Sequence, residues 1–354
     1  MRRGIADSPL HYGACPPWLF EKMKRLGRGI IEGIAEEYGS EEILRRLSDP
    51  FWFQALGCLL GFDWHSSGLT TTLCGALKEG IRGMERDLGL WIAGGKGKTS
   101  LKTPQEIEMV GDKEGIEVGH LIYASRMSAK VDNSALQDGY QIYHHTFIFT
   151  RSGKWCVIQQ GMNERTGYAR RYHWLSDELC DFVCEPHSSI VSQKVENEVL
   201  NMVARESGKA REAVALISSE HPEKTLKELE RIEILQLPKE HPVVIKRESL
   251  RKVLLKTYER KPRNFEELLG IEGVGPATIR ALALLGELIF GAKPSYRDPV
   301  KFSFAHGGKD GHPYPVNRET YEKTIQVLEE AVRLAKMGKK DKWEVLRKLA
   351  RFYK

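Results

Sequence analysis

Residues 264–291, NFEELLGIEGVGPATIRALALLGELIFG, restrict the fold of this chain more than any other stretch. Asn264 and Glu267 form a capping pair that predicts the start of a short helix. A Gly-Val-Gly sequence at 273–275 predicts a tight turn, where the missing Cβ atoms allow a close backbone approach. Pro276 then suits the first position of a second helix, because its fixed φ is already helical. The stretch therefore predicts two helices joined by a short glycine turn.

This pattern resembles a helix-hairpin-helix element. Its turn would present backbone N–H groups and a helix N-terminus to solvent, an arrangement that suits a phosphate group. In proteins that share the element, this surface holds one DNA strand through its phosphates, with little readout of bases. The resemblance implies a nucleic-acid interface that includes Gly273, Gly275 and Thr278. A hairpin with a purely structural role is the alternative.

A second glycine loop, AGGKGKTSLKTP at residues 93–104, has the look of a nucleotide-binding loop. The spacing excludes that interpretation, because the first glycine of the P-loop pattern would fall on Ile92 and because Pro104 would break the helix that should follow. Thr103 is instead expected to cap a helix that begins with Pro104. Lys96 and Lys98 flank glycine N–H groups here, which suits an oxyanion. A solvated basic turn is equally consistent with the loop alone.

Hydrophobic periodicity divides the chain near residue 190. The pattern is mainly helical up to residue 90 and then predicts strands at 139–150, 154–161 and 167–174. We therefore expect an α+β fold, with a mixed N-terminal domain (1–190) that contains a small β-sheet. The remainder (191–354) is expected to form an all-helical nucleic-acid-binding domain with basic C-terminal helices. Its helices are predicted at 191–205, 210–218, 226–234, 247–258 and 321–337.

The composition is that of a globular protein of 354 residues, with 41% hydrophobic and 29% charged residues. We found no stretch of 18 apolar residues and no apolar signal-peptide core at the N-terminus, so we expect a cytoplasmic protein without a membrane partner. The formal net charge of +6 is concentrated in residues 316–354. Such a basic segment suits a phosphate backbone, although a packed helix with a basic outer face explains it equally well.

Polar clusters make the N-terminal domain the candidate for chemistry. Asp63 and His65 lie in DWHSSG, whereas Asp132 and Asp138 precede the strand that carries His144 and His145. Adjacent strand residues point to opposite faces, so only one of these two histidines is expected to reach a site. If Ser152-Gly153 is a two-residue turn, His145 lies opposite Gln160 and Thr146 lies opposite Gln159.

Carboxylates, a histidine and a lysine are what a metal-dependent phosphodiesterase requires, because the metal activates water and neutralises the phosphate. Asp132, Asp138 and His145 are therefore candidate ligands of Mg²⁺ or Mn²⁺. Lys96 and Lys98 are the candidate phosphate contacts. Arg170 and Arg171 add two further cations for nucleic acid. The alternative is that the aspartates are ordinary turn formers and that the strand histidines are structural.

Six segments together resemble the family of proteins of unknown function numbered 763, which is found largely in archaea and thermophilic bacteria. They are DWHSSGLTT, AGGKGKTS with KTPQEI, LQDGYQIYHH, GYARRYHWLS, IEGVGPATIRALAL and DPVKFSFAHGGKDGHPYPV. The resemblance extends over most of the chain. It implies membership of the family and brings no established activity with it.

We therefore expect a DNA-binding protein, most simply a metal-dependent nuclease of DNA processing or repair. A DNA glycosylase is the first alternative, because that superfamily places a catalytic aspartate about twenty residues past its hairpin and Asp298 lies 23 residues past Gly275. Against it, Ala277 stands where bifunctional glycosylases carry lysine. A DNA-binding protein without enzymatic activity is the second alternative, which would leave the polar clusters without a role.

Overall fold

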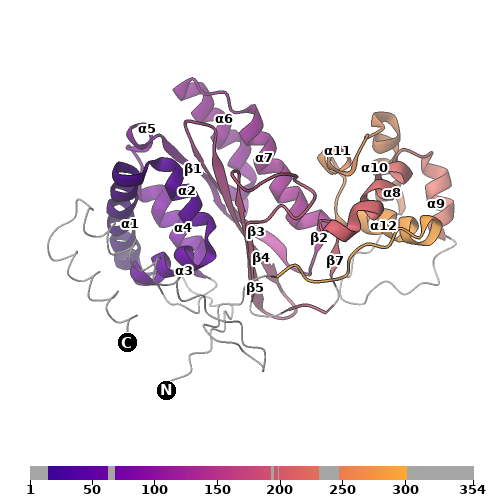
Figure 1. Cartoon of the computed structure of the whole chain (residues 1–354), viewed down its shortest axis with the longest axis horizontal. Coiled ribbons are helices and arrows are strands. Elements are labelled where there is room, and N and C mark those ends of the chain that lie inside the picture. Colours follow the sequence, from indigo (N-terminus) through magenta and orange to yellow (C-terminus); the bar gives the residue numbers. More distant parts are fainter. Residues whose placement is uncertain (1–14, 63–67, 193–194, 198, 231–246, 301–354) are drawn as a thin grey trace, which may run out of the picture.

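The structure, a computed structural model, describes residues 15–62, 68–192, 195–197, 199–230 and 247–300. A five-stranded antiparallel sheet in the order β1-β3-β4-β5-β6 forms its centre, and helices cover both faces (Figure 1). A two-stranded sheet pairs β2 with β7. The α+β class expected from the sequence is confirmed. The strands are β1 (Leu90–Lys96), β2 (Leu136–Gln137), β3 (Gln141–Thr150), β4 (Trp155–Asn163), β5 (Tyr168–Leu175), β6 (Ser189–Val191) and β7 (Leu200–Asn201).

The helices fall into three groups along the chain. The first group is α1 (Pro17–Tyr38), α2 (Ser40–Ser48), α3 (Pro50–Leu59), α4 (Gly68–Gly80) and the short α5 (Glu85–Leu88). The second is the 3-10 turn η1 (Gly97–Lys102), α6 (Thr103–Glu114), α7 (Gly119–Lys130) and the π-helical turn η2 (Val131–Ala135). The third is the 3-10 turn η3 (Arg205–Ser207), α8 (Gly208–Ser218), α9 (Pro222–Glu230), α10 (Arg247–Arg260), α11 (Phe265–Gly270) and α12 (Pro276–Phe290).

Alternation along the strands assigns each face of the sheet to one helix layer. Ile148 of β3 and Ile158 of β4 are buried in the cluster formed by α1–α4. Phe147 and Val157, their sequence neighbours, belong to the cluster that contains α6 and α7. The sheet therefore separates two apolar cores, and residues that alternate along a strand enter different environments.

The turn between β3 and β4 is one residue longer than the sequence suggested. The Thr150 N–H donates to Lys154 O (2.9 Å), so Arg151, Ser152 and Gly153 form the loop, with Gly153 at φ +82°. The predicted register was therefore wrong by one position. His145 lies opposite Gln159, and Thr146 lies opposite Ile158. A left-handed glycine at the end of a three-residue loop explains the longer connection.

The sequence predicted a helix over residues 191–205, but the described part of this segment forms no α-helix. It enters β6, which pairs with β5, and β7, which pairs with β2. Helices α8 and α10 match the prediction closely, and α9 begins four residues earlier than predicted, at Pro222. The predicted helix at 321–337 and the basic segment lie outside the described residues. Pairing with distant strands overrides a helical pattern that is only local.

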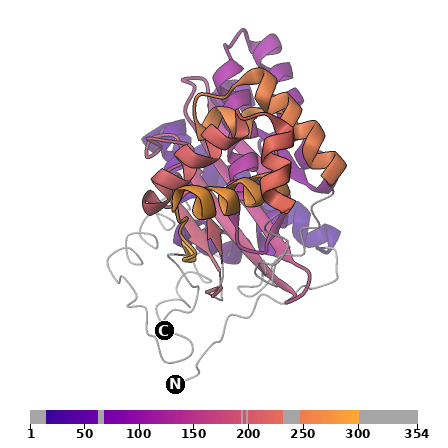
Figure 2. The ribbon, with the colours of Figure 1, turned by 90° about the vertical axis from the view of Figure 1, so that its right-hand side faces the viewer.

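Helices α8–α12 lie together beside the α7 end of the sheet, and Figure 2 views the chain from their side. One apolar cluster nevertheless runs from Phe147 in the sheet and Met127 on α7 to Leu268 on α11 and Ile279 on α12. The core is thus continuous across the boundary that the sequence pattern places near residue 190.

The glycine hairpin has the expected local structure. The Asn264 side chain accepts from the Glu267 N–H (2.8 Å) at the start of α11, and Pro276 opens α12. Gly273 adopts φ +91°, a conformation that favours glycine. Gly275 is extended at φ −141°, and a Cβ there would meet nothing closer than Gly273 O at 3.9 Å. Of these two positions, only position 273 therefore has a backbone conformation that requires glycine.

The start of α6 differs from the expectation. The helix begins at Thr103 itself, and the Thr103 hydroxyl donates to Ser100 O (2.7 Å) instead of capping the helix. Pro104 lies in the first turn, as expected. None of the helices in the described ranges combines the length and the apolar character that crossing a membrane requires.

Candidate functional site

A pocket of about 720 Å³ lies between the hairpin and the second helix group. The turn before α12 lines it, and so do the end of η1 and the start of α6. Helix α7 and strand β3 complete it. The hairpin turn and the end of the stretch 93–104, about 170 residues apart, therefore line the same pocket, whereas the glycines of that stretch are not among the lining residues. Its lining includes Ser100, Arg126, Lys130, His145, Gly273 and Gly275.

Three hydrogen bonds fix the hairpin against the rest of the chain. Lys130 Nζ donates to Val274 O (2.6 Å), and Gln137 Nε2 donates to Pro276 O (2.9 Å). Gln137 Oε1 in turn accepts from Arg280 Nε (3.0 Å). These contacts are made between α7, β2 and both ends of the turn. The distance across the pocket is therefore set by side chains that bridge its walls.

The glycine–lysine stretch 93–104 contributes its C-terminal part to the pocket. Ser100 and Leu101 line it, and Leu101 is 76% exposed at the rim. Lys96 and Lys98 are exposed just before these residues, and Lys96 Nζ lies 5.9 Å from the centre of the Tyr143 ring. Neither of the predicted lysines lines the pocket, and both are exposed to solvent.

His145 lies at the floor of the pocket between α7 and β4. Its Nε2 is 2.9 Å from Ser125 Oγ, and its Nδ1 is 2.9 Å from Gln159 Oε1. Burial lowers the pKa of His145 below its ordinary value, although Gln159 and the charge of Asp132 oppose the shift. The imidazole is therefore neutral at pH 7 and can accept a proton.

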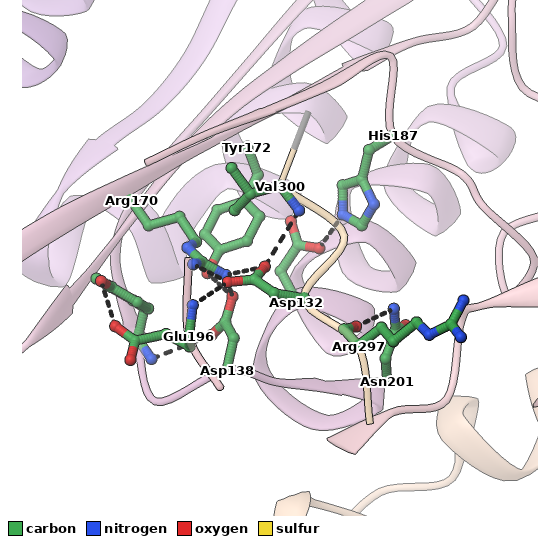
Figure 3. A network of polar contacts seen from close by, with 11 residues as sticks. Asp132, Asp138, Arg170, Tyr172, His187, Glu196, Asn201, Arg297 and Val300 are labelled. Atoms are coloured by element: carbon green, nitrogen blue, oxygen red, sulfur yellow. Dashed lines mark hydrogen bonds and ion pairs between the residues drawn. The ribbon is translucent and has the colours of Figure 1, made fainter. Parts of the chain in front are cut away.

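Asp132 lies behind Gln159, on the turn η2. Its Oδ2 accepts from Gln159 Nε2 (2.5 Å) and from Trp174 Nε1 (3.0 Å). Its Oδ1 is 2.5 Å from His187 Nε2, a contact that Figure 3 shows. The side chain of Asp132 is fully buried. Gln159 thus lies between Asp132 and His145, two of the three residues that the sequence suggested as metal ligands.

Asp138 belongs to a separate buried network (Figure 3). Its Oδ2 accepts from Arg170 Nη1 (2.8 Å) and from the Tyr172 hydroxyl (2.7 Å). Arg170 also holds Asp298 through two contacts of 3.0 and 2.7 Å. Burial raises the pKa of Asp138 despite the attraction of Arg170. The three charged side chains are fully buried and form ion pairs with one another, which is the arrangement of a structural ion network.

Arg171 and His144 face the other layer of helices. Arg171 donates to His173 Nε2 (2.9 Å) and to Gln54 Oε1 (3.1 Å), and its side chain lies on the Phe53 ring. His144 contacts Thr146 Oγ1 (2.9 Å), and burial lowers its pKa to about 3. The two adjacent histidines do occupy opposite faces. A phosphate could reach Arg170 or Arg171 only by displacing their interior partners.

The predicted site residues therefore separate into distinct places. Of the predicted catalytic residues that the structure describes, only His145 lines the pocket. The described residues contain no group of three His, Cys, Asp or Glu side chains arranged to share a metal ion. Thr278 is buried on α12. Asp63 and His65 lie outside the described residues.

Three residues of the site were not proposed as site residues from the sequence. Ser125 lies on α7 among apolar neighbours, Gln159 lies within an apolar strand, and Arg126 is one exposed arginine among many. The one available signal was a serine on the buried stripe of a helix, where a hydroxyl needs a partner. Pairing of distant elements decides what that partner is.

Comparison with known families shows which family the chain belongs to. The model of the family described as protein of unknown function (DUF763) matches residues 4–316. The chain belongs to the DUF763 family. Searches of curated proteins and of solved structures found no match to it. The pocket lies within the matched residues, so its walls and floor are part of the region that defines a DUF763 protein.

Proposed function

We propose that this DUF763 protein binds DNA through the pocket between α7, η1 and the glycine hairpin, and that it breaks phosphodiester bonds there. The observation that carries the proposal is that the hairpin turn, with Gly273 and Gly275, lines one pocket together with Ser100, Leu101 and Pro104, which belong to the C-terminal part of the glycine–lysine stretch 93–104. Backbone N–H groups at glycine turns and at helix N-termini are suited to phosphate oxygens. The hairpin turn and the N-terminus of α6 are two such elements in one pocket, which favours a polymer of phosphates over a single nucleotide.

The charges of the pocket support the same conclusion. Arg126 lines it, is exposed, and has no hydrogen bond or ion pair with any residue in the described part of the chain. Lys130 lies one turn further along α7 and also lines the pocket. Glu272 at the hairpin is acidic, but it is paired with Lys256 (3.2 Å). Arginine with an open guanidinium is the side chain best suited to a phosphate backbone.

The lining also offers apolar surface. Leu101 is 76% exposed and Tyr123 is 44% exposed, and both contact the pocket. Exposed apolar and aromatic side chains beside cations allow unstacked bases to lie against the protein. We therefore favour single-stranded or locally opened DNA as the bound form.

Binding can be tested by fluorescence anisotropy with labelled single-stranded and double-stranded DNA over a series of salt concentrations. Arg126→Ala is expected to weaken binding to all sequences and to lower the slope of log K against log salt by about 1. Arg82→Ala is the matched control, because that arginine is exposed and follows α4, on the other side of the sheet. Unchanged affinity and slope in Arg126→Ala would place DNA elsewhere.

Cleavage can be tested with the same DNA in Mg²⁺, Mn²⁺ or EDTA. The metal-dependent form of the proposal requires Asp132 to exchange Gln159 or His187 for the ion. It predicts cleavage that EDTA abolishes and that Asp132→Asn removes without loss of binding. Cleavage that continues in EDTA would instead assign the reaction to the protein side chains at the pocket floor.

A further inference from the structure

We propose that Ser125 and His145 form a nucleophile–base pair at the floor of this pocket, and that Ser125 Oγ accepts a phosphoryl group from the bound phosphodiester. This inference rests on the proposed function, since it names the chemistry of the same pocket. The two residues come from α7 and β3 and lie 2.9 Å apart, Oγ to Nε2. Ser125 is 2% exposed and His145 4%, yet both line the pocket.

The direction of the hydrogen bond follows from Gln159. Its Nε2 donates to Ser128 O (3.3 Å) and to Asp132 Oδ2 (2.5 Å), so its carbonyl oxygen is the atom that faces His145. That oxygen can only accept, and therefore Nδ1 of His145 carries the proton. In the neutral imidazole, Nε2 then has the free lone pair and accepts from the Ser125 hydroxyl.

Gln159 and Asp132 thus have a positioning role. Trp174 and His187 hold the Asp132 carboxylate, Asp132 holds the Gln159 amide, and the amide fixes the tautomer and the plane of His145. This is the arrangement of an activated nucleophile, in which the base is itself oriented by a third group. The negative charge of Asp132 lies one amide away and favours the imidazolium that forms during the reaction.

The residues around Ser125 favour the phosphorus atom of a phosphodiester over the carbonyl carbon of an ester as the atom that Ser125 attacks. Arg126 adjoins Ser125 in sequence, and Lys130 lies further along α7; both line the pocket. A phosphodiester carries a permanent negative charge that these cations and the hairpin N–H groups can hold. A neutral carboxylic ester carries no negative charge for these groups to bind.

The reaction needs no reagent other than water. Ser125 Oγ attacks phosphorus and its proton passes to Nε2 of His145; the Oγ–P bond forms and the P–O bond to one sugar breaks. The sugar oxygen leaves on the side of phosphorus opposite Ser125 and takes a proton from a water molecule, which becomes a hydroxide ion. In the second half, the hydroxide enters on the side that the sugar left, its oxygen bonds to phosphorus, the Oγ–P bond breaks, and the His145 imidazolium returns its proton to Ser125 Oγ. One phosphodiester and one water give a phosphomonoester and a hydroxyl group.

The test uses the full chain with labelled single-stranded DNA, in EDTA, followed by rapid denaturation in SDS. A covalent DNA–protein adduct is expected, and peptide mass spectrometry should map it to Ser125 of the unaltered protein. Ser125→Ala should abolish the adduct and reduce cleavage to background while DNA binding persists. His145→Gln should reduce cleavage about 10²–10⁴-fold.

Ser128→Ala is the matched control. Ser128 is equally buried on α7, and its hydroxyl donates to Ser125 O (3.1 Å), away from His145. This variant should retain both the adduct and the cleavage. Thermal unfolding followed by circular dichroism should show comparable stability of the two serine variants, so that loss of fold is not mistaken for loss of the nucleophile.

Other outcomes overturn the inference in distinguishable ways. Cleavage that persists in Ser125→Ala would remove Ser125 as nucleophile. DNA binding without any cleavage would do the same and leave the binding function standing. Absence of DNA binding would reject the proposed function. In that case, turnover of p-nitrophenyl acetate that depends on Ser125 would replace phosphoryl transfer by acyl transfer.

Discussion

Arg170 and Asp298 form a two-contact ion pair, with Nη1–Oδ1 at 3.0 Å and Nη2–Oδ2 at 2.7 Å, that joins strand β5 to the segment following α12. Asp298 Oδ2 also accepts from the Glu196 N–H (2.7 Å) and Oδ1 from the Val300 N–H (3.1 Å). Its side chain is fully buried. Both carboxylate oxygens accept hydrogen bonds, so Asp298 could act as the aspartate of a DNA glycosylase only by exchanging one of these partners.

The first prediction concerns this ion network. Arg170→Met should lower the free energy of unfolding by about 3–5 kcal/mol, because Asp138 and Asp298 would remain buried without a cation. Urea denaturation followed by circular dichroism measures the change. Arg263→Ala is the control, since Arg263 forms an exposed ion pair with Glu267 and its loss should have little effect. Equal losses in the two variants would mean that Arg170 is not structural.

The second prediction concerns pH. Burial lowers the pKa of His144 to about 3, whereas the unfolded chain titrates near pH 6.5. Between these values the unfolded state binds the additional proton, so stability is present above pH 6.5 and decreases as the pH falls. The contribution of His144 amounts to about 2 kcal/mol between pH 7 and pH 5.

His144→Gln tests this pH dependence. The loss of stability between pH 7 and pH 5 should be smaller in the variant than in the unaltered protein, by roughly the 2 kcal/mol that linkage assigns to one histidine. Urea midpoints at the two pH values give the comparison. The same substitution at exposed His120 serves as the control. A variant with the unaltered pH slope would contradict the burial of a neutral His144.

The third prediction separates the two hairpin glycines. Gly273→Ala should destabilise the protein by about 1–2 kcal/mol, because φ is +91° and a Cβ would lie 3.3 Å from the Val253 side chain. Gly275→Ala should be nearly neutral for folding, since its backbone is extended and the space is open. Because Gly275 lines the pocket, Gly275→Val should instead weaken DNA binding.

Thermal unfolding and anisotropy, measured on the same variants, check the third prediction. Stability should fall only for Gly273→Ala, and affinity should fall for Gly275→Val at unchanged melting temperature. The opposite pattern would show that Gly275, and not Gly273, sets the conformation of the turn.

The sequence by itself determined the features that depend on neighbouring residues. Local backbone geometry and hydrogen bonding explain why Asn264 caps α11 and why Pro276 opens α12. The two-residue repeat of a strand explains the alternation along β3. Membership of the DUF763 family was also readable from six segments of the chain. Local rules suffice in these cases because the groups involved lie within a few residues of one another.

The tertiary structure decided everything that required distant elements to meet. The left-handed Gly153 shifted the β3–β4 register by one residue and brought Gln159, not Gln160, opposite His145. Packing of α7 on that face then placed Ser125 against the imidazole. Neither contact has a local signal, because a hydroxyl on a helix and an amide on a strand gain their roles only from the partner that the fold supplies.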